Sequence, residues 1–253
     1  MGASPSTPST LEIDPQDPTQ AIVWIDLIQA GGFDTKTIPE EVATLRLKCQ
    51  KKAMEKNKKK APVLSCVKEL KHVKHVVVDG SCRGVQVILG GFLSYCPSLE
   101  TVVFAGSCLE QVETVGYNFL AYSGQVKSIE FSPGCFNNVQ ALDFAFMSDL
   151  KALQTAVFPP GSFSKLVGLR SFMMNCESLQ TIHFPPETFC QLTCIESSFM
   201  TGCKRLARVD FPQHAFTHVT SVFVDADFLC GCDSLEVVTF PRTAFITLDD
   251  WYT

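Results

Sequence analysis

Apolar residues recur along most of the chain at a nearly constant spacing. An aromatic residue followed by Leu or Met marks each recurrence, at Phe92, Phe119, Phe146, Phe172, Phe199 and Phe228. The successive steps are 27, 27, 26, 27 and 29 residues. Because chance does not supply the same spacing six times, the sequence predicts a repeat array in which each unit forms one coil of a solenoid.

An apolar triplet spaced Leu-x-x-Val-x-Phe occupies the same place in every unit. Its copies are Val73/Val76/Val78, Leu99/Val102/Phe104, Val126/Ile129/Phe131, Leu153/Ala156/Phe158, Leu179/Ile182/Phe184, Leu206/Val209/Phe211 and Leu235/Val238/Phe240. Its last two members flank an outward residue, as His183 lies between Ile182 and Phe184, which is typical of a short strand. A proline such as Pro185 then ends the strand, because proline cannot continue a ladder. The pattern predicts about seven units with parallel strands.

A second, mostly aromatic position follows each triplet after five residues. It holds Leu109, Phe136, Phe163, Phe189, Phe216 and Phe245. The excess of 20 Phe over 4 Tyr and 2 Trp suggests that Phe fills a recurring structural position. One unit has too few apolar residues to fold alone, so the units must stack and bury their faces against each other.

Two segments of this repeat resemble a known family. Val112–Leu120 (V-x-x-V-G-x-x-F-L) and Phe172–Pro185 (F-M-x-x-C-x-x-L-x-x-I-x-F-P) resemble the BspA-like class of leucine-rich-repeat proteins, over about residues 65–248. The resemblance implies an α/β solenoid with a parallel sheet of short strands on the concave face and irregular or short-strand convex segments. It also implies adhesion or interaction rather than catalysis. The extra aromatic turn in Pro185–Phe189 departs from the commoner pattern.

The sequence before the repeats predicts a disordered tail followed by a helical cap. Residues 1–20 are rich in Ser, Thr and Pro and are expected to be disordered. Ala21–Ala30 is apolar enough for a short helix, which Gly31 and Gly32 would end. A second helix is predicted from Thr37, with Val42, Leu45, Cys49 and Ala53 at helical spacing. Residues 21–62 are thus expected to form a helical N-terminal cap, followed by the leucine-rich-repeat domain over 63–253.

The net charge of −5 conceals a strongly basic segment. Residues 46–74 hold eleven bases and two acids, whereas 1–45 and 75–253 are acidic. The basic patch comprises Lys51, Lys52, Lys56, Lys58, Lys59 and Lys60. A capping role is favoured for this region; binding of nucleic acid or an anionic membrane is the rival. The lysine run also counts against a degenerate F-box at Ile38–Val42.

The N-terminal residues give information about where in the cell the protein is located. Met1–Ser6 fits the myristoylation pattern, with Gly2 as the lipidated residue. Because one acyl chain binds only weakly, the basic patch could serve as a second signal, and membrane contact is expected only if Gly2 is acylated. The sequence has neither a signal peptide nor an apolar run near the ~18 residues of a membrane helix. A cytoplasmic protein whose twelve Cys are free thiols is therefore expected.

Candidate chemistry is sparse. Cys176, Cys203 and Cys232 share one repeat position, but Leu70, Ser123 and Leu150 take the same place in other units, so structural thiols are favoured over metal ligands or disulfides. His214 and His218 lie four residues apart without a H-E-x-x-H carboxylate. No G-x-S-x-G, Walker or G-x-G-x-x-G motif is present. We expect no catalytic residue, metal or cofactor, and no enzyme activity.

A partner surface is predicted on the outward strand positions. Its candidate residues are Thr101, Val103, Glu130, Thr155, Val157, His183, Arg208 and Asp210. The expected function is a protein–protein interaction module or scaffold; the alternatives are a structural subunit of a larger assembly, or a membrane- or nucleic-acid-associated protein that uses residues 46–74. An open last coil after Phe245 further predicts self-association, or pairing with another protein, by strand addition.

Overall fold

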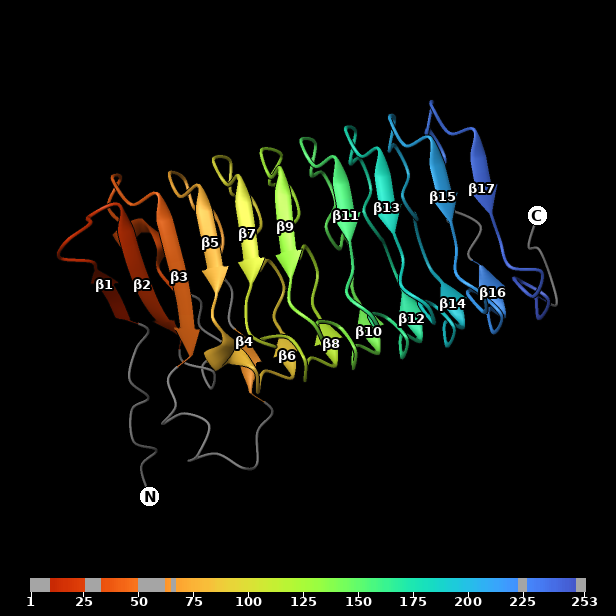
Figure 1. Ribbon diagram of the computed structural model, residues 1–253, viewed down its shortest axis with the longest axis horizontal. Helices are drawn as coiled ribbons and strands as arrows, with labels where there is room; N and C mark the ends of the chain where they lie inside the picture. The colour runs from red at the N-terminus through yellow and green to blue at the C-terminus, as the bar shows by residue number, and fades with distance from the viewer. Residues whose placement is uncertain (1–9, 26–32, 50–61, 65–66, 223–226, 249–253) are drawn as a thin grey trace, which may run out of the picture.

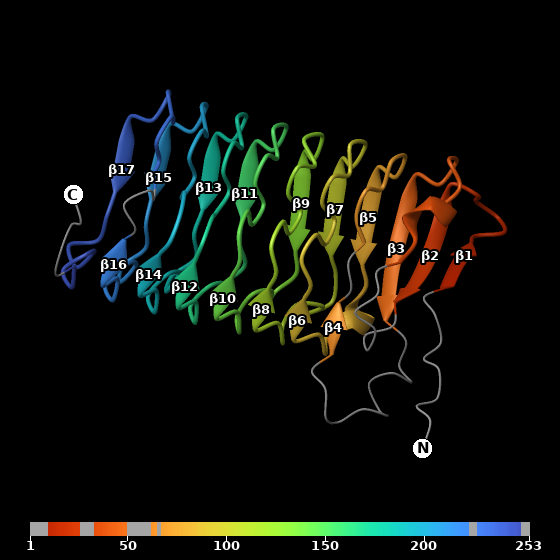
Figure 2. The same cartoon turned by 180° about the vertical axis from the view of Figure 1, so that it is seen from behind.

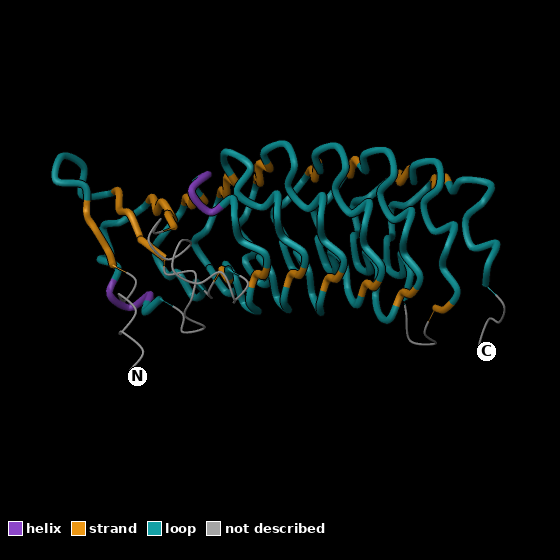
Figure 3. The backbone as a smooth tube through the Cα atoms, turned by 90° about the horizontal axis from the view of Figure 1, so that it is seen from below, coloured by secondary structure: helices purple, strands orange, loops and turns teal. Residues whose placement is uncertain are grey.

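The computed structural model is a β-solenoid in which two rows of strands run the length of the array (Figure 1). It describes residues 10–25, 33–49, 62–64, 67–222 and 227–248. Views from behind and from below show the two rows on different sides of the same coils (Figures 2 and 3). The helical content of these ranges is two short 3₁₀ turns, η1 (Thr35–Thr37) and η2 (Gly80–Cys82). Within them no helix has the length and apolarity needed to cross a membrane.

The longer strands form the first row. They are β5 (His75–Val78), β7 (Thr101–Phe104), β9 (Ser128–Phe131), β11 (Thr155–Val157), β13 (Thr181–His183), β15 (Arg208–Asp210) and β17 (Val237–Thr239). Each coincides with one of the seven predicted triplets. Residues alternate between core and solvent, as in β13, where Ile182 is buried and Thr181 and His183 are exposed. The seven strands predicted from the triplets are confirmed.

Two-residue strands form the second row. They are β4 (Val63–Leu64), β6 (Val87–Ile88), β8 (Thr114–Val115), β10 (Ala141–Leu142), β12 (Gly168–Leu169), β14 (Cys194–Ile195) and β16 (Ser221–Val222). They make one continuous parallel ladder. The first residue of each strand faces outward and the second, such as Leu169, faces the core. The sequence predicted short-strand or irregular segments here, and the structure has the short strands.

A third stretch of backbone completes each coil, and in it residues of positive φ alternate with residues of negative φ. In one coil Asn118, Leu120 and Tyr122 have φ of 57°, 58° and 59°. The left-handed conformation costs roughly 1–2 kcal/mol for a residue with a Cβ. It turns successive N–H groups to opposite sides, so that Leu120 donates to Phe92 of the preceding coil at 2.8 Å and Tyr122 donates to Ser148 of the next at 2.9 Å. Hydrogen bonds between coils thereby offset the conformational cost.

The core between these three stretches is a set of phenylalanine columns. The ring of Phe172 stacks on Phe146 and Phe199 of the adjacent coils, with centroids 5.4 and 5.3 Å apart. Four further rings lie edge-on or tilted within 6.2 Å of it: Phe158, Phe163, Phe184 and Phe189. Stacked and edge-to-face pairs add stability beyond the apolar area they bury. Each coil is therefore held by its neighbours.

The predicted helical N-terminal cap is wrong. The region instead forms β1 (Thr10–Ile13), β2 (Gln20–Ile25) and β3 (Thr44–Cys49), and β3 pairs in parallel with β5. In β3, Leu45, Leu47 and Cys49 are buried and the residues between them are not, a period of two that fits a strand. The helical interpretation gave too little weight to this alternation. In β2 it also overlooked a β-branched and aromatic composition that favours strands.

The tail prediction also needs correction. Residues 10–13 are not disordered but form β1, which pairs antiparallel with β2 and lies at the edge of the sheet. An antiparallel edge strand covers the backbone groups that β2 would otherwise present. The N-terminal side of the array is thus covered by strands rather than helices. Residues 1–9 and 50–61, with Gly2 and the basic patch, lie outside the described ranges.

The ladder of the long-strand row is interrupted twice. Although all four strands are described, β9 is not paired with β11, nor β13 with β15. Figure 1 shows these two steps standing wider than their neighbours. Every step of the short-strand row keeps its ladder. The long-strand side is therefore the wider side of the array at these two steps.

Replacement of one column ring tests the core. Phe172→Ala should lower the free energy of unfolding by about 3–5 kcal/mol, because it empties a fully buried site surrounded by six rings. Phe144→Ala is the matched control, since this ring is 43 % exposed and should cost no more than about 0.5 kcal/mol. Urea denaturation followed by circular dichroism measures both. Equal losses would contradict the stacked-column core.

Hydrogen exchange tests the interrupted ladder. The amides of Ile129 and Val157 face the step between β9 and β11, whereas that of His183 faces β11 across an intact ladder. We expect the first two to exchange faster than His183, because exchange reports local opening of hydrogen bonds. Residue-resolved exchange by NMR would show the difference, and equal protection at the three amides would mean that the ladder is continuous in solution.

Candidate interaction surface

The outward side chains of the long-strand row form the surface that we call the long-strand face. The structure places all eight predicted partner residues on it, at two positions per strand. Thr101 and Val103 lie on β7, and the parallel register sets them beside Ser128 and Glu130 of β9. Because register is regular within each block of paired strands, the outward side chains form regular rows across the face.

Apolar exposure on this face centres on Val157. Its side chain is 54 % exposed, in the middle of the row, whereas Val103 is half-buried among its neighbours. Thr155 and Thr181 flank it, and their hydroxyls are joined by a hydrogen bond of 3.1 Å. Short β-branched residues of this kind present a flat surface that a partner can cover without displacing long side chains.

The predicted centre of the site is divided by an interrupted ladder. Val103 and Glu130 belong to one block of paired strands, whereas Val157 and His183 are paired neighbours in the next. No ladder crosses from β9 to β11. The residues are therefore brought to one face, but not into one continuous sheet, and the spacing pattern of the repeat gave no signal of this division.

Charged residues lie at the C-terminal side of the face. Arg208 donates to both carboxylate oxygens of Asp210, at 2.5 Å from Nε and 2.8 Å from Nη2. This hydrogen-bonded guanidinium lowers the pKa of the Asp210 carboxyl below its ordinary value of 3.8. The two residues thus satisfy each other, and a partner would gain little from either charge alone.

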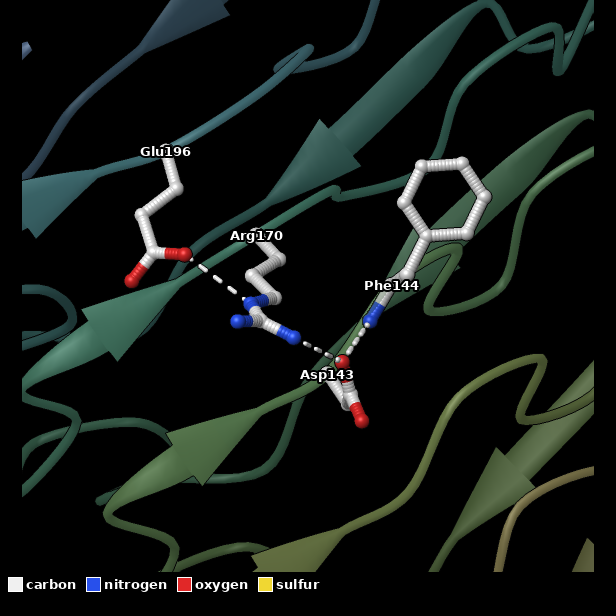
Figure 4. Close-up of polar contacts among 4 residues, drawn as sticks. All are labelled: Asp143, Phe144, Arg170 and Glu196. Carbon is white, nitrogen blue, oxygen red and sulfur yellow. Dashed lines mark hydrogen bonds and ion pairs between the residues drawn. The ribbon is translucent and has the colours of Figure 1, made fainter. Parts of the chain in front are cut away.

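The short-strand side of the array has a different character. Arg170 follows β12 and bridges Asp143 after β10 and Glu196 after β14, at 3.2 and 2.9 Å (Figure 4). The pKa of Arg170 is raised above its ordinary range by these carboxylates, first by Glu196. In the turns that precede the long strands, Glu177 is shared between Lys151 and Lys204 on neighbouring coils. These ion pairs were not predicted, although the repeat spacing of 26 or 27 residues between opposite charges was a usable signal.

Two residues of the basic segment, Arg46 and Lys48, make contacts on the outward side of β3. Arg46 pairs with Asp79 at 3.4 Å, and the Lys48 ammonium lies 5.4 Å from the centre of the Trp24 ring. A cation over an indole face is attracted by the ring quadrupole. These two charges contribute to contacts between β3 and its neighbours.

The expectation that every cysteine is a free thiol is wrong at two positions. Cys49 and Cys82 form a disulfide, with Cα atoms 5.2 Å apart. The thiols of Cys176, Cys203 and Cys232 each contact a main-chain carbonyl of the preceding coil, at 3.2–3.3 Å. Among the described residues, no three or more His, Cys, Asp or Glu are grouped so as to hold a metal ion, and this includes His214 and His218.

The last described coil exposes apolar side chains. Val237 of β17, Phe240 and Ile246 are exposed, and no described strand pairs with the outer edge of β17. An unpaired edge of this kind can accept a further strand. Self-association through this coil stays a prediction, and a mass that does not change with concentration in light scattering would count against it.

Comparison with known proteins adds little to this geometry. No protein-family model matches the chain, and no curated protein matches it. Among solved structures, a leucine-rich cell surface protein from Faecalibacterium prausnitzii is 13 % identical, covers 96 % of this chain and 90 % of its own, and has a TM-score of 0.24. A leucine-rich-repeat protein from Eubacterium ventriosum is 11 % identical, with coverages of 89 % and 93 % and a TM-score of 0.25. At these values neither similarity carries an argument, so the solenoid is described from its own coils.

Titration of Asp210 tests the ion pair. Arg208→Gln should raise the pKa of Asp210 toward 3.8, because the charged donor is lost. Since the folded pKa is depressed, the pair stabilises the fold above the ordinary pKa, and this contribution is lost as pH falls through the folded value. Carboxyl chemical shifts followed by NMR give the pKa. Arg170→Gln, on the other side of the array, should leave it unchanged.

Proposed function

We propose that the chain is a non-catalytic interaction module that binds a protein partner across the long-strand face. The observation that carries the proposal is Val157, an apolar side chain 54 % exposed at the middle of a flat strand face. Thr155, Thr181 and the half-buried Val103 extend this surface with short side chains. The charged residues Glu130, Arg208 and Asp210 lie around it. Binding surfaces with an apolar centre and a polar rim are typical of protein–protein contacts.

The other side of the array supports the same choice of face. There the strands are two residues long, and Arg170 ties Asp143 and Glu196 together across three coils. A partner would have to displace or desolvate these ion pairs, which costs free energy that a short contact does not return. On the long-strand face, Val157 offers apolar contact at a point between Glu130 and the Arg208–Asp210 ion pair, so a partner can cover it without displacing an ion pair.

The alternative functions have less support. Within residues 46–74, which would make a nucleic-acid or membrane contact, Arg46 and Lys48 are engaged with Asp79 and Trp24. The role of Lys51–Lys60 and lipidation at Gly2 stay predictions, because these residues lie outside the described ranges. A cytoplasmic location also stays a prediction, and the Cys49–Cys82 disulfide is a reason to test it, since such bonds persist mainly in oxidising compartments.

A pair of matched substitutions tests the proposed function. Val157→Lys and Val167→Lys change the same residue type at similar exposure, 54 % and 48 %, on opposite sides of the array. In affinity purification with quantitative mass spectrometry, Val157→Lys should reduce recovery of a specific partner at least about tenfold, as expected for a loss near 1.4 kcal/mol. Val167→Lys should retain it. Equal recovery with both variants, each shown to be folded by circular dichroism, would overturn the assignment of this face.

A further inference from the structure

Three cysteines occupy the same place in three consecutive coils. Val78, Phe104 and Phe131 are aligned in the parallel register of β5, β7 and β9. Cys82, Cys108 and Cys135 each follow the aligned residue by four positions, and all three are fully buried. Neighbouring strands of a sheet lie roughly 5 Å apart, so these sulfurs form a column along the array. We call Cys49, Cys82, Cys108 and Cys135 the sulfur column, since Cys49 precedes Cys82 in the coil before.

The first step of the sulfur column is already a covalent bond. Cys49, at the end of β3, is joined to Cys82, and their Cα atoms are 5.2 Å apart. That separation lies within the usual range for disulfides. The coil-to-coil spacing on this edge of the array is therefore compatible with a cross-link between stacked cysteines.

The next pair, Cys108 and Cys135, consists of buried free thiols at stacked positions. The pKa of Cys108 is raised and that of Cys135 is lowered, in each case first by the interaction with the other sulfur. The Ser132 hydroxyl also lies 3.7 Å from the Cys135 sulfur. These contacts favour Cys135 as the thiolate and Cys108 as its proton-bearing neighbour. A thiolate beside a second thiol is the arrangement from which disulfides form by exchange.

The second group of stacked thiols differs in its main-chain partners. Cys176, Cys203 and Cys232 direct their thiols to the carbonyls of Met147, Met173 and Met200. The pKa values of Cys203 and Cys232 are raised, first through hydrogen bonds with the adjacent sulfur, Cys176 for the former and Cys203 for the latter. Cys203 and Cys232 are therefore held in the protonated form, which is not the nucleophile in thiol exchange.

We propose that Cys108 and Cys135 are a second, reversible cross-linking site of the solenoid, oxidised by low-molecular-weight disulfides. The Cys135 thiolate attacks the external disulfide, forms a mixed disulfide and releases one thiolate. Cys108 then loses its proton to solvent and attacks the Cys135 sulfur, forming the Cys108–Cys135 bond and releasing the second thiolate. Two protein thiols are oxidised and one external disulfide is reduced to two thiols. Because both sulfurs are buried, the turn over 132–137 must open for the reagent to enter.

Peptide mapping after redox equilibration tests the proposal. The folded protein is incubated with oxidised and reduced glutathione, alkylated, and cut after Lys and Glu, which places Cys108 in residues 101–110 and Cys135 in residues 131–151. We expect these two peptides joined, with the loss of two hydrogens. In a parallel sample, the protein is refolded from urea in the same buffer. Both thiols are then accessible during oxidation, so the reaction does not depend on slow opening of the turn over 132–137. The oxidised protein should also unfold at a higher temperature, and a reductant should reverse both changes.

Two serine variants separate this bond from other reactions. Cys108→Ser should abolish both the joined peptide and the rise in unfolding temperature, whereas Cys176→Ser, from the second group of stacked thiols, should retain them. The proposal is overturned if the two peptides stay separate in the refolded sample. It is equally overturned if glutathione remains on Cys135 as the end product, or if Cys108 is found joined to Cys82.

Discussion

Stacking of identical rings between adjacent coils is the interaction on which the structure depends. Each coil is too small to bury its own core, so a ring such as Phe172 has its partners in the coils before and after it. Equivalent strands and turns of successive coils are therefore aligned with each other along the array. This explains why the hydrogen-bond ladders, the sulfur column and the ion-pair ladders all share the period of the phenylalanines.

The same constraint explains the unusual backbone. Leu120 and Met147 adopt a left-handed conformation that glycine would adopt more readily. A glycine there would leave the core without the buried side chain that each residue contributes. Packing therefore selects the residue, and hydrogen bonds to the coils on both sides compensate for the conformational cost. Each coil therefore contacts its neighbours along three stretches: the long strand, the short strand and the stretch with left-handed residues.

The sequence predicts the array well and its N-terminal part poorly, for a physical reason. Inside the repeats six aligned copies average out local ambiguity, so the strands at Ile182 and Val209 could be located from spacing alone. Residues 21–49 offer one copy of each pattern, and Leu45 and Cys49 fit a helical period as well as a strand period. The outward position of Val157 and His183 followed from the alternation. The interrupted ladder beside Val157 did not, because no side-chain pattern distinguishes a paired strand from a strand that lies slightly too far from its neighbour.

The interrupted steps give the array an unequal resistance to bending. Lengthening the long-strand side at β9/β11 or β13/β15 breaks no ladder hydrogen bond, because none is present there. Lengthening the short-strand side would break ladder bonds at every coil. The array can therefore bend with the least loss of hydrogen bonds at these two steps, on the face that carries Val157. A ligand that spans either step would fix the curvature of the array as well as occupy its surface.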